Sequence, residues 1–255
     1  MKYLNNFFRN KNGVVSIEFA ACFFLFSLLV FIIYDVYSTI MLQNKLERAN
    51  YTVASIFRER SAIYPMVGNG NSSNNYLTCI RDLKSCYRSH ELFDDNQVQE
   101  LRQLASSLLD RDVAIRVDAL FVLQDPRHPQ DLHHAKLATL SSESCSAGVC
   151  DSAISYFGSL PDMIGRSSPR NNDYLKLIPY VQRTIDPATG LTGRWIPLYR
   201  ISMCIVNEES LYLKWKNSSR EATDTFPNLC SNIALLSRCN NIAENNGSAC
   251  PIYHR

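Results

Sequence analysis

The feature that most constrains this 255-residue chain is a long apolar run near its N-terminus. The run extends from Val14 to Tyr34, and as an α-helix its 21 residues would reach about 31 Å at about 1.5 Å per residue. Because that length matches the hydrocarbon core of a bilayer, we expect residues 14–34 to form a transmembrane helix. One acidic residue, Glu18, lies inside the run. A charged side chain in hydrocarbon costs about 2.5 to 3.5 kcal/mol, so we expect Glu18 to have a function.

The charges beside the run favour a cytoplasmic N-terminus. Three basic residues and no acidic residue precede the run, and two basic residues follow closely: Lys2, Arg9 and Lys11 before it, Lys45 and Arg48 after it. A cleavable secretory signal is the alternative interpretation. The run is longer than the apolar core of most signals, contains Glu18, and is not followed by an Ala-x-Ala site, so we expect the helix to be retained.

The sequence from Gly13 to Ala20, Gly-Val-Val-Ser-Ile-Glu-Phe-Ala, resembles the N-terminal motif of type IV prepilins. Within that class it is similar to the TadE/TadF-like pseudopilins of the tight adherence (Flp) pilus, and the length of the chain favours TadF. In such proteins a membrane peptidase cuts after a glycine and a glutamate is the fifth mature residue. The resemblance therefore implies a 1–13 leader, cleavage between Gly13 and Val14, and Glu18 followed by Phe19 as the assembly motif.

The same resemblance implies a minor pilin that takes part in pilus assembly in the bacterial inner membrane. Its implied partners are the prepilin peptidase, other Tad pilins and pseudopilins, and the inner-membrane assembly platform, with the domain in the periplasm or carried into the pilus. Cleavage would free the cationic α-amine of Val14, which we expect to pair with Glu18 of a neighbouring subunit. An uncut single-pass protein with a periplasmic scaffold or adhesin domain is the alternative.

Beyond the apolar run, an apolar stripe at steps of three and four residues predicts that the helix continues through residues 35–61. The stripe consists of Leu42, Leu46, Ala49, Val53 and Ile56. Residues 62–76 contain glycine, proline and many asparagine and serine residues, so we expect a linker there. Residues 77–255 are then expected to form a periplasmic α+β domain, which is long enough to bury one core.

Local patterns within 77–255 predict both helix and strand. Asp94 and Gln97 resemble a capping box before a helix over 95–109, and residues 113–123 alternate as a strand does. We also expect strands over 195–206 and 210–216, and loops over 125–134, 141–152 and 161–173. The predicted fold class is α+β, with a long N-terminal pilin-type helix followed by a disulfide-containing domain.

Nine cysteines are distributed unevenly along the chain, since only Cys22 lies in the apolar run. The other eight predict disulfides, and thus an oxidising compartment: Cys79, Cys86, Cys145, Cys150, Cys204, Cys230, Cys239 and Cys250. Short spacings favour the pairs Cys79 with Cys86 and Cys145 with Cys150, and leave the remaining four to pair among themselves. The irregular spacings and the lack of a Cys-x-x-Cys pair make zinc the less favoured interpretation.

No catalytic motif, phosphate-binding loop or dinucleotide fingerprint occurs in the sequence, so we expect no enzyme, cofactor or small-molecule substrate. A tethered hydrolase using a serine-rich loop is the rival hypothesis, but no base and acid accompany such a serine. His128, His133 and His134 lie near Asp125 and Asp131, and we interpret them as exposed polar residues rather than a metal site. The net charge of +2 predicts no nucleic-acid partner.

Overall fold

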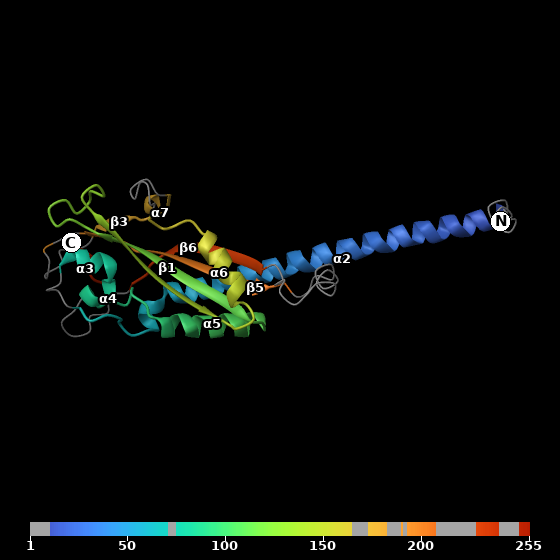
Figure 1. Ribbon diagram of the computed structural model, residues 1–255. Helices are drawn as coiled ribbons and strands as arrows, with labels where there is room; N and C mark the ends of the chain where they lie inside the picture. The colour runs from blue at the N-terminus through green and yellow to red at the C-terminus, as the bar shows by residue number, and fades with distance from the viewer. Residues whose placement is uncertain are drawn as a thin grey trace. The chain divides into compact units, whose positions relative to one another are not determined.

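A computed structural model describes residues 11–70, 75–164, 173–182, 190, 193–207, 228–239 and 250–255. The chain divides into two compact units, one made of Met1–Asn44 with Asn207–Phe226 and the other of Lys45–Val206 with Pro227–Arg255. One 48-residue helix, α2 (Lys11–Arg58), contributes to both (Figure 1). Helix α2 thus extends beyond the apolar run and ends at Arg58, whereas the sequence predicts a continuation to residue 61.

The second unit combines short helices with antiparallel sheets, so the predicted α+β class is confirmed. Its described elements are η1 (Arg60–Ala62), α3 (Tyr76–Arg81), α4 (Leu83–Cys86), α5 (Asp95–Leu109), β1 (Val113–Leu123), β2 (Lys136–Cys145), α6 (Cys150–Ser159), α7 (Asp173–Lys176), β3 (Tyr180–Gln182), β4 (Gly193–Trp195), β5 (Leu198–Val206) and β6 (Asn228–Leu236). The strands form a four-stranded sheet in the order β2-β1-β5-β6 and a two-stranded sheet of β3 and β4.

Alternation along β1 gives the large sheet two different faces. Val113, Ile115 and Val117 lie on one face, which we call the helix face, and Ala114 and Asp118 lie on the other. Antiparallel pairing places Ile201 opposite Val117, so the helix face continues onto β5. Every residue of β1 except Arg116 is buried, which identifies this strand as the centre of the core.

The second half of α2 packs on the helix face. The Phe57 ring meets the rings of Tyr199 and Phe93 edge-on, with centroids 5.1 and 5.6 Å away. Asn50 donates from Nδ2 to the carbonyl oxygen of Ile201 at 3.5 Å and to Oγ of Ser231 at 3.2 Å. Of the apolar stripe expected from the sequence, Leu42, Leu46, Ala49 and Val53 are buried, whereas Ile56 is half-buried.

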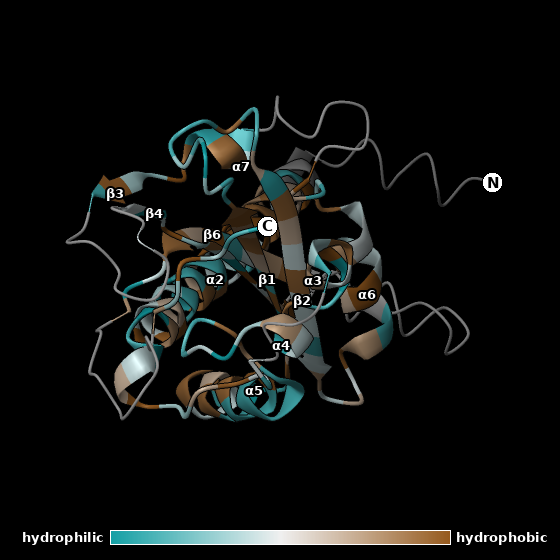
Figure 2. Cartoon of the chain, turned by 90° about the vertical axis from the view of Figure 1, so that its left-hand side faces the viewer, coloured by the Kyte–Doolittle hydropathy of each residue, from teal (hydrophilic) through white to brown (hydrophobic). Residues whose placement is uncertain are grey.

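Helix α5 covers the rest of the helix face. Its N-cap, Asp94, accepts a hydrogen bond from the backbone N–H of Gln97 at 2.9 Å, and it ends at Asp110 in the left-handed conformation, with φ of 54°. Ser142 on β2 donates to Asp95 at 2.6 Å, which ties the start of the helix to the sheet. Figure 2 colours α5 brown and teal on different sides, as its amphipathic pattern requires.

The opposite face of the sheet holds two apolar clusters with an ion pair between them. Helix α6 packs Ala153 and Phe157 near Ala114, and a second cluster centres on Leu120 and Trp195. Between them, the carboxylate of Asp118 accepts from Nε and Nη2 of Arg200 at 3.1 and 2.7 Å. Burial lowers the pKa of the Arg200 guanidinium, but the contacts with Asp118 outweigh burial and raise it overall.

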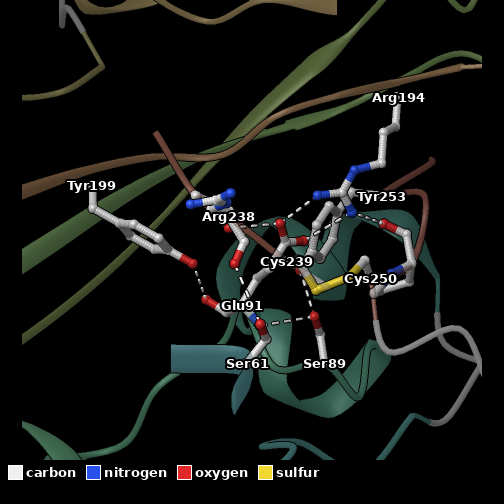
Figure 3. A network of polar contacts seen from close by, with 11 residues as sticks. Ser61, Ser89, Glu91, Arg194, Tyr199, Arg238, Cys239, Cys250 and Tyr253 are labelled. Atoms are coloured by element: carbon white, nitrogen blue, oxygen red, sulfur yellow. Dashed lines mark hydrogen bonds and ion pairs between the residues drawn. A yellow bond between two sulfur atoms is a disulfide. The ribbon is translucent and has the colours of Figure 1, made fainter. Parts of the chain in front are cut away.

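A second buried charge pair centres on Glu91, whose side chain is fully buried (Figure 3). Nη1 of Arg194 donates to Oε2 of Glu91 at 3.0 Å, and Nη2 of the same guanidinium contacts Oε1. Ser237, just after β6, donates to Oε1 at 2.8 Å, and Tyr199 donates to the backbone carbonyl of Glu91 at 2.8 Å. These partners satisfy a carboxylate that would otherwise be costly to bury.

The C-terminal residues join this polar centre to the core. Tyr253 is buried and donates through its phenol to Ser89 at 3.0 Å, as Figure 3 shows. Its carbonyl accepts from the backbone N–H of Gln124 at 2.8 Å. Nη1 of Arg194 also donates to the carbonyl of Pro251 at 3.2 Å. The terminal segment is therefore held by main-chain and side-chain contacts alike.

Four disulfides join the eight cysteines beyond the apolar run. They are Cys79–Cys86, Cys145–Cys150, Cys204–Cys230 and Cys239–Cys250, and the first two are the short loops that spacing predicts. Cys204–Cys230 links residues that lie opposite each other on β5 and β6. Cys239–Cys250 attaches the C-terminal segment to the chain that follows β6.

Several local predictions differ from the structure. Residues 141–152 were expected to be a loop, but β2 extends to Cys145 and α6 begins at Cys150. The strand expected over 195–206 is divided, because β4 ends at Trp195 and β5 begins only after Pro197, which has no N–H to donate. The strand expected over 210–216 lies outside the described residues.

We predict that Arg194→Met lowers the free energy of unfolding by about 3 to 5 kcal/mol, because it leaves the buried Glu91 carboxylate without its cation. The matched control is Arg238→Met. The guanidinium of Arg238 is 62% exposed and pairs with Glu59 at 3.0 Å, so its loss should cost less than about 1 kcal/mol. Urea unfolding of the detergent-solubilised chain measures both, and equal losses would contradict the prediction.

We also predict that stability falls as pH rises above about 10. Burial raises the pKa of Tyr87 to about 12, and burial raises the pKa values of Tyr199 and Tyr253. The folded state then holds these protons at a pH where unfolded tyrosine, with a pKa of about 10, has lost them, so unfolding is favoured between about pH 10 and about pH 12. Unfolding free energies measured across that range, with tyrosinate absorbance recorded in parallel, test this; a flat profile would contradict it.

Candidate functional site in the first half of helix α2

The large apolar side chains in the first half of α2 are exposed in the part of the chain that the structure describes. The described helix from Ser16 contains one stretch long and apolar enough to cross a membrane, and none of that stretch is buried. Phe19 is 72% exposed, and large side chains on all sides of the helix are exposed as well: Phe23, Phe24, Leu25, Phe26, Leu29, Phe31, Ile32 and Ile33. Such a helix near the N-terminus is typical of a membrane anchor or of a signal sequence.

The motif residues lie in regular helix. Gly13 and Val14 fall within α2, two and three residues after its first residue, Lys11. Glu18 is exposed and lies one turn further along. The rings of Phe19 and Phe23 stack with their centroids 6.3 Å apart, as expected for side chains four residues apart on one helix face.

Hydroxyl side chains in the apolar stretch and just after it bond to the helix itself. Ser27 donates to the carbonyl of Phe23 at 2.8 Å, and Ser38 and Thr39 donate to the carbonyl of Asp35 at 2.9 and 3.0 Å. Because these hydroxyls are satisfied within the helix, they do not oppose its placement in an apolar medium. Glu18 is the one acidic residue in the sequence from Val14 to Tyr34, and its neighbours on the helix are mostly apolar.

The family comparison matches residues 6–147 to the family described as "Putative tight adherence pilin protein F", or TadF. The matched segment is more than half of the chain and includes the Gly13 to Ala20 motif, the whole of α2 and the elements through β2. The chain belongs to the TadF family. The comparisons with curated proteins and with solved structures give no match.

Membership of the TadF family implies a structural, non-enzymatic protein that works with the tight adherence pilus machinery. The match also decides between the TadE and TadF resemblances. The sequence alone had favoured TadF only through the length of the chain. The strands β5 and β6, and with them the second half of the sheet, lie beyond the matched residues.

The histidines expected to be polar surface residues lie in the loop between β1 and β2. The rings of His128 and His134 stack on each other, and His134 bonds to Asp131. Among the described residues no group of three or more His, Cys, Asp or Glu side chains is arranged to hold a metal ion. Cys22 is the free cysteine of the described chain and is exposed on α2.

Sequence reasoning missed the residues that hold the domain together. Glu91 and Arg194 are 103 positions apart, and neither belongs to a motif. The one signal in the sequence was that Arg194 directly precedes Trp195 and the strand expected over 195–206. An isolated charge beside such a strand is a reason to search for a buried partner.

Proposed function

We propose that this chain is a minor pilin of a tight adherence pilus that is cut after Gly13 and helps to start or stabilise filament assembly. Residues 14–34 would anchor it in the bacterial inner membrane, with the N-terminus cytoplasmic and residues 77–255 in the periplasm. Adherence and biofilm formation are the cellular properties that we expect to depend on it.

The observation that carries this proposal is the exposure of the first half of α2. Burying apolar surface stabilises a protein by roughly 25 cal/mol per Å², so a helix with exposed large side chains on all sides is stabilised when other apolar groups cover it. Lipid supplies that cover before assembly, and the corresponding helices of other subunits can supply it in a filament.

Glu18 determines which cover is favourable. Lipid offers no counter-ion, whereas a neighbouring subunit cut after Gly13 offers the α-amine of Val14, which is cationic near neutral pH. Pairing the two charges lowers the cost of keeping Glu18 in an apolar layer, and it sets the axial position of one helix against the next. Removing one member would leave the other charge uncompensated.

We predict that N-terminal sequencing of the membrane-extracted chain from cells with the pilus system yields Val14 as the first residue. Gly13→Leu should remain uncut, because the side chain obstructs the bond to be cleaved. Asn12→Ala, one position earlier, is the matched control and should be cut normally. An intact Met1 in the unaltered chain would overturn the pilin proposal and favour the uncut single-pass alternative.

We predict that Glu18→Ala is inserted and cut but is lost from pili, since the amine of its neighbour has no partner. Co-purification with sheared pili measures this loss. Glu47→Ala removes an exposed carboxylate from the same helix beyond the apolar stretch and should leave incorporation unchanged. Normal incorporation of Glu18→Ala would refute the charge-pairing mechanism.

A further inference from the structure

The four disulfides follow the order of the cysteines along the chain. After the apolar run, the first cysteine is bonded to the second, the third to the fourth, the fifth to the sixth and the seventh to the eighth. Eight cysteines can pair in many other ways, and most of those pairings contain disulfides that cross or enclose one another. The consecutive order is therefore a property of this fold that needs a physical reason.

Most of the disulfides contain sulfur that is closed to solvent in the folded domain. Four cysteines are buried, and they belong to three of the disulfides: Cys79, Cys86, Cys204 and Cys250. A disulfide forms by attack of a thiolate on sulfur, so the reacting atoms must be accessible. These three bonds are therefore formed most readily before the domain has closed around them.

The surroundings of Cys204 show what obstructs late oxidation. Cys204 is 0% exposed and lies in the apolar cluster that includes Ala153 and Phe157 of α6. The disulfide Cys145–Cys150 joins the last residue of β2 to the first residue of α6. Once α6 has packed on the sheet, an enzyme cannot reach the sulfur of Cys204. Its disulfide with Cys230 has to form earlier.

The sheet keeps the sulfurs of different disulfides apart. Ala114 on β1 lies opposite Cys145 on β2 and opposite Cys204 on β5, so these two cysteines are separated by two strand spacings, or about 10 Å. Cysteines with Cα atoms more than about 7 Å apart cannot be bridged without movement of the backbone. Cys230, in contrast, lies directly opposite Cys204. A disulfide between Cys145 and Cys204 is thus incompatible with the folded sheet.

The order of the disulfides matches the order in which the domain would enter the periplasm. With the N-terminus cytoplasmic and residues 14–34 as the anchor, residues 77–255 cross the membrane with their N-terminal end first. The first two pairs have sequence separations of only 7 and 5 residues, and a long stretch without cysteine follows each of them. Each of these cysteines therefore meets its native partner well before any other cysteine arrives.

We propose that the exported domain is the substrate of a thiol oxidase that carries a reactive disulfide and joins the cysteines in order as they emerge, without need of a disulfide isomerase. The inference rests on the proposed placement of residues 77–255 in the periplasm. Pairing in order of arrival produces all four native disulfides directly, so no wrong pair has to be reopened.

The reaction at each pair is two successive thiol–disulfide exchanges. The thiolate of one cysteine attacks the disulfide of the oxidase, which forms a mixed disulfide and releases one oxidase thiolate. The thiolate of the next cysteine then attacks the chain sulfur of the mixed disulfide and releases the second oxidase thiolate. The two cysteines are oxidised, the oxidase disulfide is reduced to a dithiol, and the two protons of the cysteine thiols pass to the oxidase.

Production of the full chain in bacterial cells that lack either the thiol oxidase or the disulfide isomerase tests this proposal. Free thiols are alkylated before extraction, and disulfide-linked peptides are identified by mass spectrometry. Every chain carries Cys22→Ser, so that alkylation reports only the other eight cysteines. We expect the four native pairs in undiminished proportion without the isomerase, and loss of disulfides to free thiols without the oxidase.

A cysteine variant and its matched control make the test sharper. Cys150→Ser removes the partner of Cys145, so that Cys204 is the next cysteine to arrive. We expect non-native disulfides that include Cys145, and a larger share of them in cells without the isomerase. The double variant Cys145→Ser, Cys150→Ser lacks the same disulfide but restores the consecutive order, and its three remaining disulfides should form natively without the isomerase.

Two results would overturn the inference: non-native disulfides in the Cys22→Ser chain when the isomerase is missing, or a complete native set when the oxidase is missing. Eight reduced cysteines in cells with both enzymes would contradict the periplasmic placement as well. Native disulfides in a chain that stays uncut at Gly13 would contradict the pilin proposal alone. The outcomes for the oxidation pathway and for the pilin function are thus distinguishable.

Discussion

The buried carboxylate of Glu91 is the interaction on which the folded domain most depends. A charge in the interior is tolerated only when all of its partners are present. The Glu91 carboxylate accepts from Arg194 on β4 and from Ser237 after β6. Arg194 also donates to the carbonyl of Pro251 in the C-terminal segment. Segments far apart in sequence are thereby fixed to one point. The same region holds the Phe57 ring of α2 against Tyr199, which itself donates to the Glu91 carbonyl. Anchoring of α2 and burial of Glu91 are thus linked through one tyrosine.

Helix α2 meets two different environments along one continuous hydrogen-bonded backbone. Its apolar stretch has exposed side chains on all sides, whereas Leu46, Val53 and Phe57 are fully buried in the core of the second unit. The change follows directly from the sequence, because an all-round apolar pattern gives way to a stripe at steps of three and four. The core contacts fix the second half of α2, and the first half is free to take its cover from lipid or from other subunits.

Local patterns allowed much of this fold to be predicted, and their limits are physical. The continuous helix, the cap of α5 at Asp94 and strand β1 could be predicted because periodicity and capping depend on near neighbours in sequence. Strands β2 and β6 were missed, since their serine and asparagine residues are typical of loops and only pairing with β1 and β5 makes them strands. The partnership of Glu91 with Arg194 depends on the complete fold. The motif at Gly13 and Glu18 could be identified because its residues lie close together in sequence, whereas the adjacency of His128 and His134 arises from the path of a loop.

The chemistry of the cysteines gives a further argument for the proposed topology. All four disulfides lie between residues 79 and 250, and the free thiol of Cys22 lies in the apolar stretch. Disulfides persist in oxidising compartments such as the bacterial periplasm, and residues within the bilayer lie outside such a compartment. Placing residues 14–34 in the bilayer and residues 77–255 in the periplasm therefore accounts for the oxidation state of every cysteine. The reverse orientation would place the four disulfides in the cytoplasm, where the reducing environment favours their conversion to thiols.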